Sequence, residues 1–346
     1  MGIVLASAPA PASDCSAPRL LLPAHLYAVV NEPSEIWRDN VALRDGYCAQ
    51  SCRVLDGPAA LRVYDHLEDR WRVFPTTAGN YTLEVGAGGQ TKTATLHVAP
   101  ALPAEAPVKR VAPVGDSITA AVGDGGYVRH LSTALGARMV LLGTQTNNTY
   151  KSEGFPGSQW QRFATQFGNV PEAGVPNSPF CTATSTINIP AWRTAVGADP
   201  DLVTWSLGTN DIYPTDLAAV TAKSVASFAY AEALISAFKA ALPSARHLLV
   251  PCWPGNANAG AWAGGAAPAL TYRQKAHLWA ELLEARFASR EAEGIYHLGG
   301  SFLQIDRARG YPSNNDIHPD VNAGHVTLAR TLRHWMTWQW VFGFWA

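Results

Sequence analysis

The stretch PVGDSITA, residues 113–120, runs from a short apolar segment through Gly115, Asp116 and Ser117 into a helix-like segment. A glycine, an acid and a serine at such a junction have two interpretations. Ser117 is either a plain N-cap after a glycine turn, because serine is a preferred N-cap residue, or a nucleophile at the start of a helix. The residues that the rest of the chain places beside this stretch decide between the two.

Short apolar segments and helical patterns alternate after this stretch. The apolar segments predict strands at 110–114, 138–143, 201–208, 246–253 and 294–299, and apolar side chains at helical spacing predict helices at 125–136, 214–243, 271–288 and 322–340. This alternation is typical of a parallel sheet with helices on both faces, an α/β fold. In such sheets ligands bind beyond the carboxyl ends of the strands, so we look for chemistry in the residues that follow each strand.

The region before Pro113 has a different pattern. Short, partly alternating segments rich in β-branched and aromatic side chains fill residues 18–100 and predict a small all-β sandwich. The segment TTAGNYTLEV, residues 76–85, resembles a late strand of an immunoglobulin-like domain. We therefore divide the chain into a flexible N-terminus (1–17), an immunoglobulin-like β domain (18–100), a stiff Pro- and Ala-rich linker (101–107) and an α/β domain (108–346).

Composition excludes several classes of protein. The 346 residues carry a formal net charge of -1, which gives no indication of a nucleic-acid partner. No apolar run approaches the roughly 20 residues that cross a bilayer. The five cysteines are no disulfide framework, although the spacing of Cys48 and Cys52 fits one bridge, and zinc-ligand spacing is missing. The start of the chain leaves the compartment open, with an extracellular or periplasmic location favoured.

Four polar or glycine clusters follow the predicted strands, and their residue types fit acyl-ester hydrolysis. A serine hydroxyl needs an adjacent base, and His318 is of the right type near neutral pH. The oxyanion of the tetrahedral intermediate needs pre-aimed donors, for which we take the Ser117 N–H, the Gly157 N–H and the Asn210 amide. The clusters are 115–117, 154–157 (with Gly154 and Gly157), 208–211 and 314–320.

Together these clusters resemble the SGNH (GDSL-type) hydrolase family, named for its Ser, Gly, Asn and His. The resemblance covers roughly 108–346, where GDSIT (115–119), EGFPGSQW (153–160), GTND (208–211) and DIHPDVNAGH (316–325) stand in the family's order. It implies a flavodoxin-like three-layer fold and a serine esterase that uses no metal and no cofactor. In that setting the N-cap interpretation of Ser117 becomes the minor one.

One position departs from the family pattern. The family usually has an acid three residues before the histidine, where this chain has Asn315, and the acid follows one residue later as Asp316. Either Asp316 reaches His318 Nδ1, or Asn315 or a backbone carbonyl orients the ring. A carboxylate stabilises an imidazolium better than an amide, so we favour Asp316. Asp116 is expected to support the nucleophile loop without reacting.

The substrate is less defined by the sequence. Trp160, Trp253 and Trp262 lie in or near predicted loops, where their rings could stack on sugars or simply pack. We expect a small-molecule or glycan ester as substrate, with short acyl groups, acetyl on carbohydrate above all. Residues 255–270 could instead flank the acyl channel of a lipid or thioester hydrolase. A carbohydrate-binding protein on a decayed hydrolase fold is the third alternative, and the oligomeric state stays open.

Overall fold

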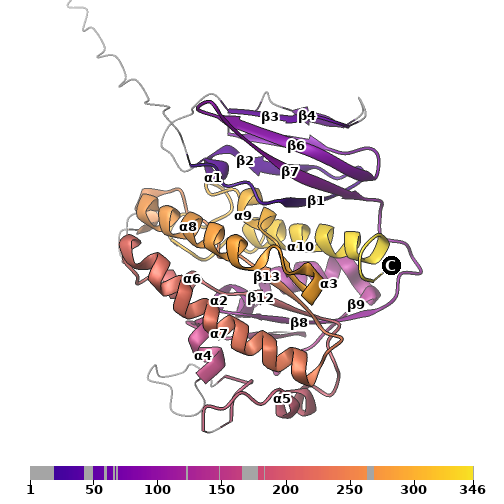
Figure 1. Ribbon diagram of the computed structural model, residues 1–346, viewed down its shortest axis with the longest axis vertical. Helices are drawn as coiled ribbons and strands as arrows, with labels where there is room; N and C mark the ends of the chain where they lie inside the picture. The colour runs from indigo at the N-terminus through magenta and orange to yellow at the C-terminus, as the bar shows by residue number, and fades with distance from the viewer. Residues whose placement is uncertain are drawn as a thin grey trace, which may run out of the picture.

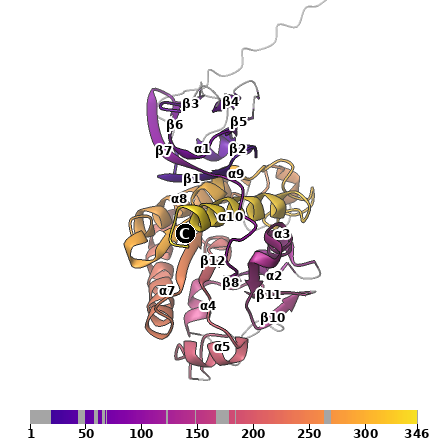
Figure 2. The same cartoon turned by 90° about the vertical axis from the view of Figure 1, so that its right-hand side faces the viewer.

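The computed structural model describes residues 19–42, 50–57, 61–64, 67, 69–121, 124–147, 149–165, 178–182, 184–262 and 269–345. A β-rich region, whose strands lie within residues 25–99, packs against one side of a larger α/β domain (Figures 1 and 2). The predicted N-terminus (1–17) and Cys48 of the suggested Cys48–Cys52 bridge lie outside the described residues. Within the described residues, no helix has the length and apolarity that a membrane span requires.

The β-rich region contains two sheets, which confirms the all-β prediction. Four strands pair in the order β1-β7-β6-β3 and three in the order β2-β5-β4. Side chains alternate as expected for half-buried strands, since Trp71 and Val73 are fully buried between partly buried neighbours. The strands are β1 (His25–Val29), β2 (Ser34–Trp37), β3 (Gln50–Val54), β4 (Arg62–Tyr64), β5 (Arg70–Phe74), β6 (Gly79–Ala87) and β7 (Gln90–Ala99), with the short helix α1 (Arg38–Val41) after β2.

The α/β domain is built on a mixed, mainly parallel sheet. The order is β10-β11-β8-β12-β13-β14, with β9 also pairing with β8, and β10 and β11 are antiparallel. All five residues of β12 are buried, as expected for a strand covered on both faces. The strands are β8 (Lys109–Gly115), β9 (Met139–Leu141), β10 (Gln145–Asn147), β11 (Tyr150–Gly154), β12 (Leu202–Ser206), β13 (Arg246–Val250) and β14 (Ile295–His297).

Helices cover the two faces of this sheet. The side chains of β12 belong to two different apolar clusters, one on each face of the sheet. Leu202 packs with residues of α3 and α10, and Trp205 packs with residues of α7 and α8. This arrangement of helix, sheet and helix is the predicted three-layer fold. The helices are α2 (Ser117–Ala120), α3 (Gly126–Leu135), α4 (Trp160–Thr165), α5 (Ile189–Val196), α6 (Thr209–Ile212), α7 (Val220–Ala241), α8 (Ala269–Phe287), α9 (Gly300–Gln304) and α10 (Gly324–Val341).

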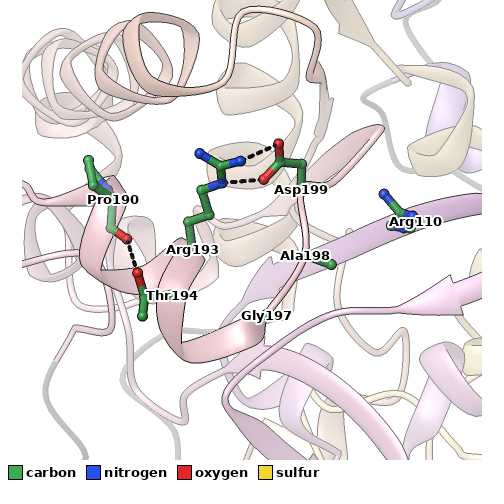
Figure 3. A pocket seen from close by; sticks show the side chains of 7 residues that line it. All are labelled: Arg110, Pro190, Arg193, Thr194, Gly197, Ala198 and Asp199. Atoms are coloured by element: carbon green, nitrogen blue, oxygen red, sulfur yellow. Dashed lines mark hydrogen bonds and ion pairs between the residues drawn. The ribbon is translucent and has the colours of Figure 1, made fainter.

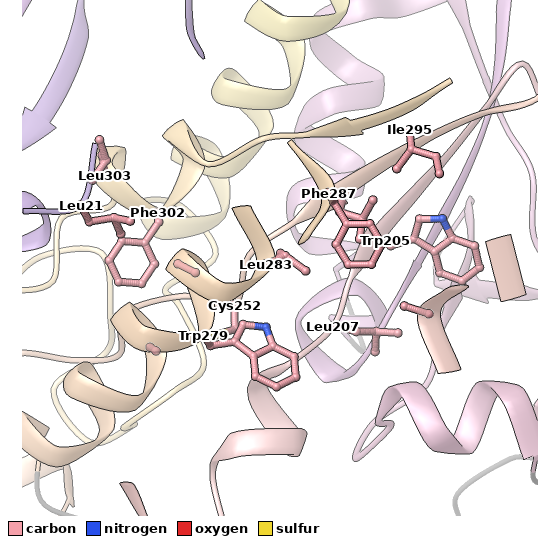
Figure 4. Packing of buried hydrophobic residues seen from close by; sticks show 14 of the residues in the cluster. Leu21, Trp205, Leu207, Cys252, Trp279, Leu283, Phe287, Ile295, Phe302 and Leu303 are labelled. Atoms are coloured by element: carbon pink, nitrogen blue, oxygen red, sulfur yellow. The ribbon is translucent and has the colours of Figure 1, made fainter. Parts of the chain in front are cut away.

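One apolar core joins the β-rich region to the α/β domain. Leu21 lies near Phe302 and Leu303 of α9, in the cluster that continues to Trp205 of the central sheet (Figure 4). Polar contacts cross the same boundary: Arg307 pairs with Asp39 at 2.8 Å. The β-rich region is therefore packed on the α/β domain through buried side chains.

The predicted linker (101–107) is also attached to the α/β domain. Arg138 donates to the Ala106 carbonyl at 3.0 Å, and the Trp340 indole donates to the Pro107 carbonyl at 2.9 Å. Ala106 itself is buried. Extended Pro-rich segments act as spacers when they are solvated, but these contacts fix this one against the domain that follows it.

Candidate active site

Ser117 lies at the first turn after the central strand β8. Asp116, and not Ser117, is the N-cap of α2, because its Oδ1 accepts from the Ile118 N–H at 3.0 Å. Gly115 is required here, since a Cβ would lie 2.7 Å from the Ser206 carbonyl oxygen of the neighbouring strand. The plain N-cap interpretation of Ser117 is therefore wrong, and the Ser117 hydroxyl is available for other contacts.

His318 makes one of those contacts. Its Nε2 lies 2.8 Å from Ser117 Oγ, and its Nδ1 lies 3.2 Å from Asn315 Oδ1. The backbone N–H groups of Ile317 and His318 also donate to Asn315 Oδ1, which fixes the orientation of that amide. Since an amide oxygen only accepts, the proton of neutral His318 sits on Nδ1 and Nε2 can accept the serine proton.

Asp316 does not take the place that the sequence favoured for it. Its Oδ2 accepts from the Tyr213 hydroxyl at 2.6 Å and its Oδ1 from the Ile317 N–H at 2.9 Å. The hydrogen bond to His318 Nδ1 comes from Asn315 instead. The reason is local geometry: Asn315 closes a tight side-chain turn over the next residues, which aims its oxygen at the ring and turns Asp316 toward Tyr213.

The three expected oxyanion donors lie on neighbouring segments. Asn210 follows β12, and its amide nitrogen lies 3.1 Å from the Ser158 carbonyl and 3.3 Å from Asp116 Oδ2. Those two partners adjoin Gly157 and Ser117 in the chain. Gly157 adopts a φ of +72°, which favours glycine, and is exposed. The contacts of Asn210 thus bring the Ser117, Gly157 and Asn210 segments together.

Gly154 has a different part in the site. It ends β11, and a Cβ at this position would lie 2.3 Å from the backbone nitrogen of Ala120. The next residue, Phe155, donates its N–H to the Gly115 carbonyl at 3.0 Å. Gly154 therefore allows the strand to pack directly on the nucleophile helix α2.

Buried acids lie beneath the serine and the asparagine. Burial, together with the nearby charge of Asp211 and against the hydrogen bond from Ile118, raises the pKa of Asp116 to about 7. Burial likewise raises the pKa of Asp211, whose Oδ1 accepts from the Ser227 hydroxyl at 2.6 Å. Both acids are fully enclosed by protein, Asp116 at 1% and Asp211 at 0% exposure.

Burial also sets the protonation state of the base. The pKa of His318 is lowered from its ordinary value mainly by burial, and the charge of Asp316 acts in the opposite direction. His318 is therefore mostly neutral at pH 7, which is the form that accepts a proton.

The three tryptophans that we considered as sugar-stacking residues do not take that role. Trp160, Trp253 and Trp262 are 1%, 2% and 6% exposed. Their rings pack inside the protein, with Trp160 against Trp205 at 5.5 Å between ring centroids. Stacking on a sugar needs an exposed ring face, so these three side chains are core residues.

Sequence reasoning missed two residues that support the site, Tyr213 and Asn256. The Asn256 side chain donates to the carbonyls of Pro312 and Asn315, both at 2.8 Å, and so fixes the histidine loop. Asn256 belongs to the segment 255–270 that we considered as the flank of an acyl channel, of which 263–268 lie outside the described residues. The only sequence signal for Asn256 was its place in a predicted loop rich in small and amide residues. That signal did not indicate that Asn256 would contact the histidine loop.

A hollow of about 560 Å³ lies elsewhere on the surface (Figure 3). It is lined by Arg110, Arg193 and Asp199 among others, and Arg193 is paired with Asp199. Arg110 lies near the amino end of β8, whereas Ser117 follows the carboxyl end. This hollow is therefore separate from the Ser117–His318 site.

Comparison with family models gives a match that covers most of the α/β domain. Residues 114–323, more than half of the chain, match the GDSL-like Lipase/Acylhydrolase family. The chain therefore belongs to this family, and its α/β domain has the SGNH hydrolase fold. The family defines it as an esterase or acylhydrolase. No curated protein matches the chain.

Solved structures of similar fold include three esterases. A carbohydrate acetylesterase family member from Sinorhizobium meliloti is 19% identical, with 68% of this chain and 99% of that chain covered and a TM-score of 0.45. A carbohydrate esterase family 3 protein from Talaromyces cellulolyticus is 16% identical (67% and 98%, TM-score 0.42). The native aryl esterase of M. smegmatis is 18% identical (67% and 98%, TM-score 0.43). Likenesses this distant carry no information about the substrate.

Proposed function

We propose that the protein is a serine esterase that hydrolyses short-chain acyl esters, acetyl esters first, with carbohydrate as the alcohol. The observation that carries the proposal is the 2.8 Å contact between Ser117 Oγ and His318 Nε2, with His318 Nδ1 facing Asn315 Oδ1. A serine next to a base that is itself oriented by a third group is the arrangement that activates a hydroxyl.

The reaction proceeds through an acyl-enzyme. Ser117 Oγ attacks the ester carbonyl while His318 Nε2 takes the hydroxyl proton, and the protonated His318 then delivers it to the leaving alcohol. The oxyanion accepts hydrogen bonds from the N–H groups of Ser117 and Gly157 and from the Asn210 amide, which exchanges its 3.3 Å contact with Asp116 Oδ2 for the oxyanion. Each such donor is worth about 3 kcal/mol of barrier. A water molecule, activated by His318 in the same way, hydrolyses the acyl-enzyme.

Two other functions compete with this one. A lipid or thioester hydrolase would use the same Ser117 and His318 but prefer longer acyl groups. A carbohydrate-binding protein without catalysis would have no need of the serine–histidine hydrogen bond. The buried tryptophans give no support to a sugar-binding surface, so the alcohol has to be decided by assay.

The test is hydrolysis of p-nitrophenyl acetate, butyrate and octanoate by the wild type and by Ser117→Ala. We expect the highest kcat/KM on acetate and a loss of at least about a thousandfold in Ser117→Ala, as for removal of other serine nucleophiles. The control is Ser244→Ala, which changes an exposed serine in the turn between α7 and β13 and should behave as wild type.

Each outcome has a definite meaning. Preference for acetate leads to acetylated glycans as the next substrates, with released acetate as the readout. Preference for octanoate replaces the acetyl proposal with the lipid alternative. Hydrolysis that is unchanged in Ser117→Ala contradicts the mechanism.

A further inference from the structure

The carboxylate of Asp316 is fixed close to the histidine without touching its ring nitrogen. The Tyr213 hydroxyl donates to Oδ2 at 2.6 Å and the Ile317 N–H to Oδ1 at 2.9 Å. Each carboxylate oxygen therefore has a donor: Oδ1 from the residue just before His318 in the chain, and Oδ2 from a tyrosine on a distant segment. Because both of its oxygens are held, the negative charge of Asp316 stays at one position relative to His318.

Tyr213 connects this carboxylate to the oxyanion segment. It follows α6 directly, three residues after Asn210, and its N–H donates to the Thr209 carbonyl at 2.9 Å. On the other side, Lys275 of α8 donates to the Tyr213 carbonyl at 2.8 Å. The Tyr213 ring also packs near Tyr272, with 6.0 Å between centroids. The hydroxyl thus ties the histidine loop to two helices.

His318 needs a counter-charge when it accepts the serine proton. Burial disfavours the imidazolium, and the neutral amide of Asn315 orients the ring without adding charge. The charge of Asp316 raises the pKa of His318 against the effect of burial. A carboxylate that is close to the ring but not bonded to it can supply this stabilisation through space.

The other titratable groups around this loop act on a second histidine. Burial lowers the pKa of His325 on α10 to about 4, so His325 is neutral at the pH of catalysis. The charges of Asp124 and Asp320 raise the pKa of His325, and those of His130 and His318 lower it. Among the described charged groups, Asp316 raises the pKa of His318.

We propose that the two tasks of a triad acid are divided in this protein: Asn315 orients His318, and Asp316, held by the positioning residue Tyr213, supplies the counter-charge. The proposal rests on the proposed function, because it assigns roles within the same Ser117–His318 mechanism. It predicts that Tyr213 acts through Asp316 and through no other group of the site.

Two conservative variants separate charge from position. Asp316→Asn keeps an acceptor for Tyr213 and removes the charge, whereas Tyr213→Phe keeps the charge and removes the hydrogen bond. For Asp316→Asn we expect the acidic limb of the kcat/KM profile to move down by about half a pH unit, since loss of a nearby negative charge lowers a histidine pKa. We expect kcat to fall about threefold, the equivalent of half a pK unit, with KM unchanged.

Tyr213→Phe should lower kcat about twofold to threefold, with a smaller shift in the same direction, because a mobile carboxylate interacts less strongly. In the Asp316→Asn background, Tyr213→Phe should change nothing further. The control is Tyr230→Phe on α7, which removes a hydroxyl from a half-buried tyrosine outside the site.

The pKa of His318, measured by NMR titration of its ring in wild type and Asp316→Asn, gives a readout that does not depend on turnover. A decrease of about half a unit supports the proposal, and an unchanged pKa overturns it. If Tyr213→Phe lowers kcat equally with and without the Asp316 charge, Tyr213 is a structural support and the proposal is wrong. Absence of Ser117-dependent hydrolysis would contradict the proposed function instead, while the NMR titration still tests the counter-charge.

Discussion

Residues 315–318 decide how the base is oriented. Asn315 Oδ1 accepts from two backbone N–H groups and faces His318 Nδ1. This geometry follows from a side chain that caps the turn in front of it. Asn315, three residues before the histidine, therefore makes the contact with His318 Nδ1 that the sequence favoured for Asp316.

A carboxylate at that position should improve the base. In Asn315→Asp, the new charge would lie directly at Nδ1 and stabilise the imidazolium that forms during attack. We expect kcat on p-nitrophenyl acetate to rise about tenfold, and the acidic limb of the pH profile to move up by about one unit, because an adjacent negative charge raises a histidine pKa.

The matched control is Asn322→Asp, which adds the same charge at an exposed position four residues after His318. It should leave both kcat and the pH profile at wild-type values. An Asn315→Asp variant that cannot be distinguished from this control would contradict the orienting role of Asn315.

The sequence could place Ser117, Asn210 and His318 at one edge of the sheet, because strand ends converge there. It could not choose between Asn315 and Asp316, since that choice depends on turn geometry and on Tyr213 from a distant segment. The sequence could not predict the burial of Trp160, Trp253 and Trp262 either, because a tryptophan near a predicted loop can face the core or the solvent.

Among the elements, β11 and α2 show how closely backbone segments approach in the site. The Gly154 position leaves no room for a side chain, since a Cβ there would lie 2.3 Å from Ala120 N and 2.7 Å from the Thr119 carbonyl carbon. Neither atom can move without displacing the helix that begins with Ser117. Packing of these two elements therefore controls the position of the nucleophile.

Gly154→Ala should damage stability and activity together. Overpacking of this kind typically costs about 1–3 kcal/mol, which urea unfolding would measure, and kcat should fall because α2 is displaced. Gly260→Ala is the control, since the nearest atom to its Cβ is a side-chain oxygen at 3.3 Å. A Gly154→Ala variant with wild-type stability and kcat would contradict the close packing of β11 on α2.

Element prediction succeeded where apolar periodicity was strong. The segments at β8, β12, β13 and β14 and the long helices α7, α8 and α10 were predicted from their patterns. The strands β10 and β11 were not, because QTN (145–147) and YKSEG (150–154) are polar. They are strands because β10 pairs with β11 and β11 pairs with β8, and this pairing is a tertiary effect.

At the scale of the whole molecule, the apolar core extends across the boundary between the β-rich region and the α/β domain. The apolar cluster runs from Leu21 through Phe302 and Leu303 into the central sheet. Glu32 adds a polar contact with His334 of α10 at 3.0 Å, and the pKa of Glu32 is lowered to about 2, since its hydrogen bonds with His334 and Arg333 outweigh the effect of burial. Such an interface is expected to couple the unfolding of the two parts.

Calorimetry should accordingly show one unfolding transition. Phe302→Ala, at a position 1% exposed, should shift that whole transition by about 3–5 kcal/mol of stability. Phe342→Ala removes the same side chain at a position 51% exposed and should have little effect. Two separate transitions, of which Phe302→Ala moves only one, would show that the β-rich region and the α/β domain unfold independently.

The central claim is that Ser117 is a nucleophile activated by His318. The most direct measurement is the intact mass of the protein after incubation with a fluorophosphonate, followed by peptide mapping of the adduct. We predict one adduct, located on Ser117, that is absent from Ser117→Ala and forms far more slowly in His318→Ala. An adduct on another residue, or none on wild-type protein that is folded, would contradict the account.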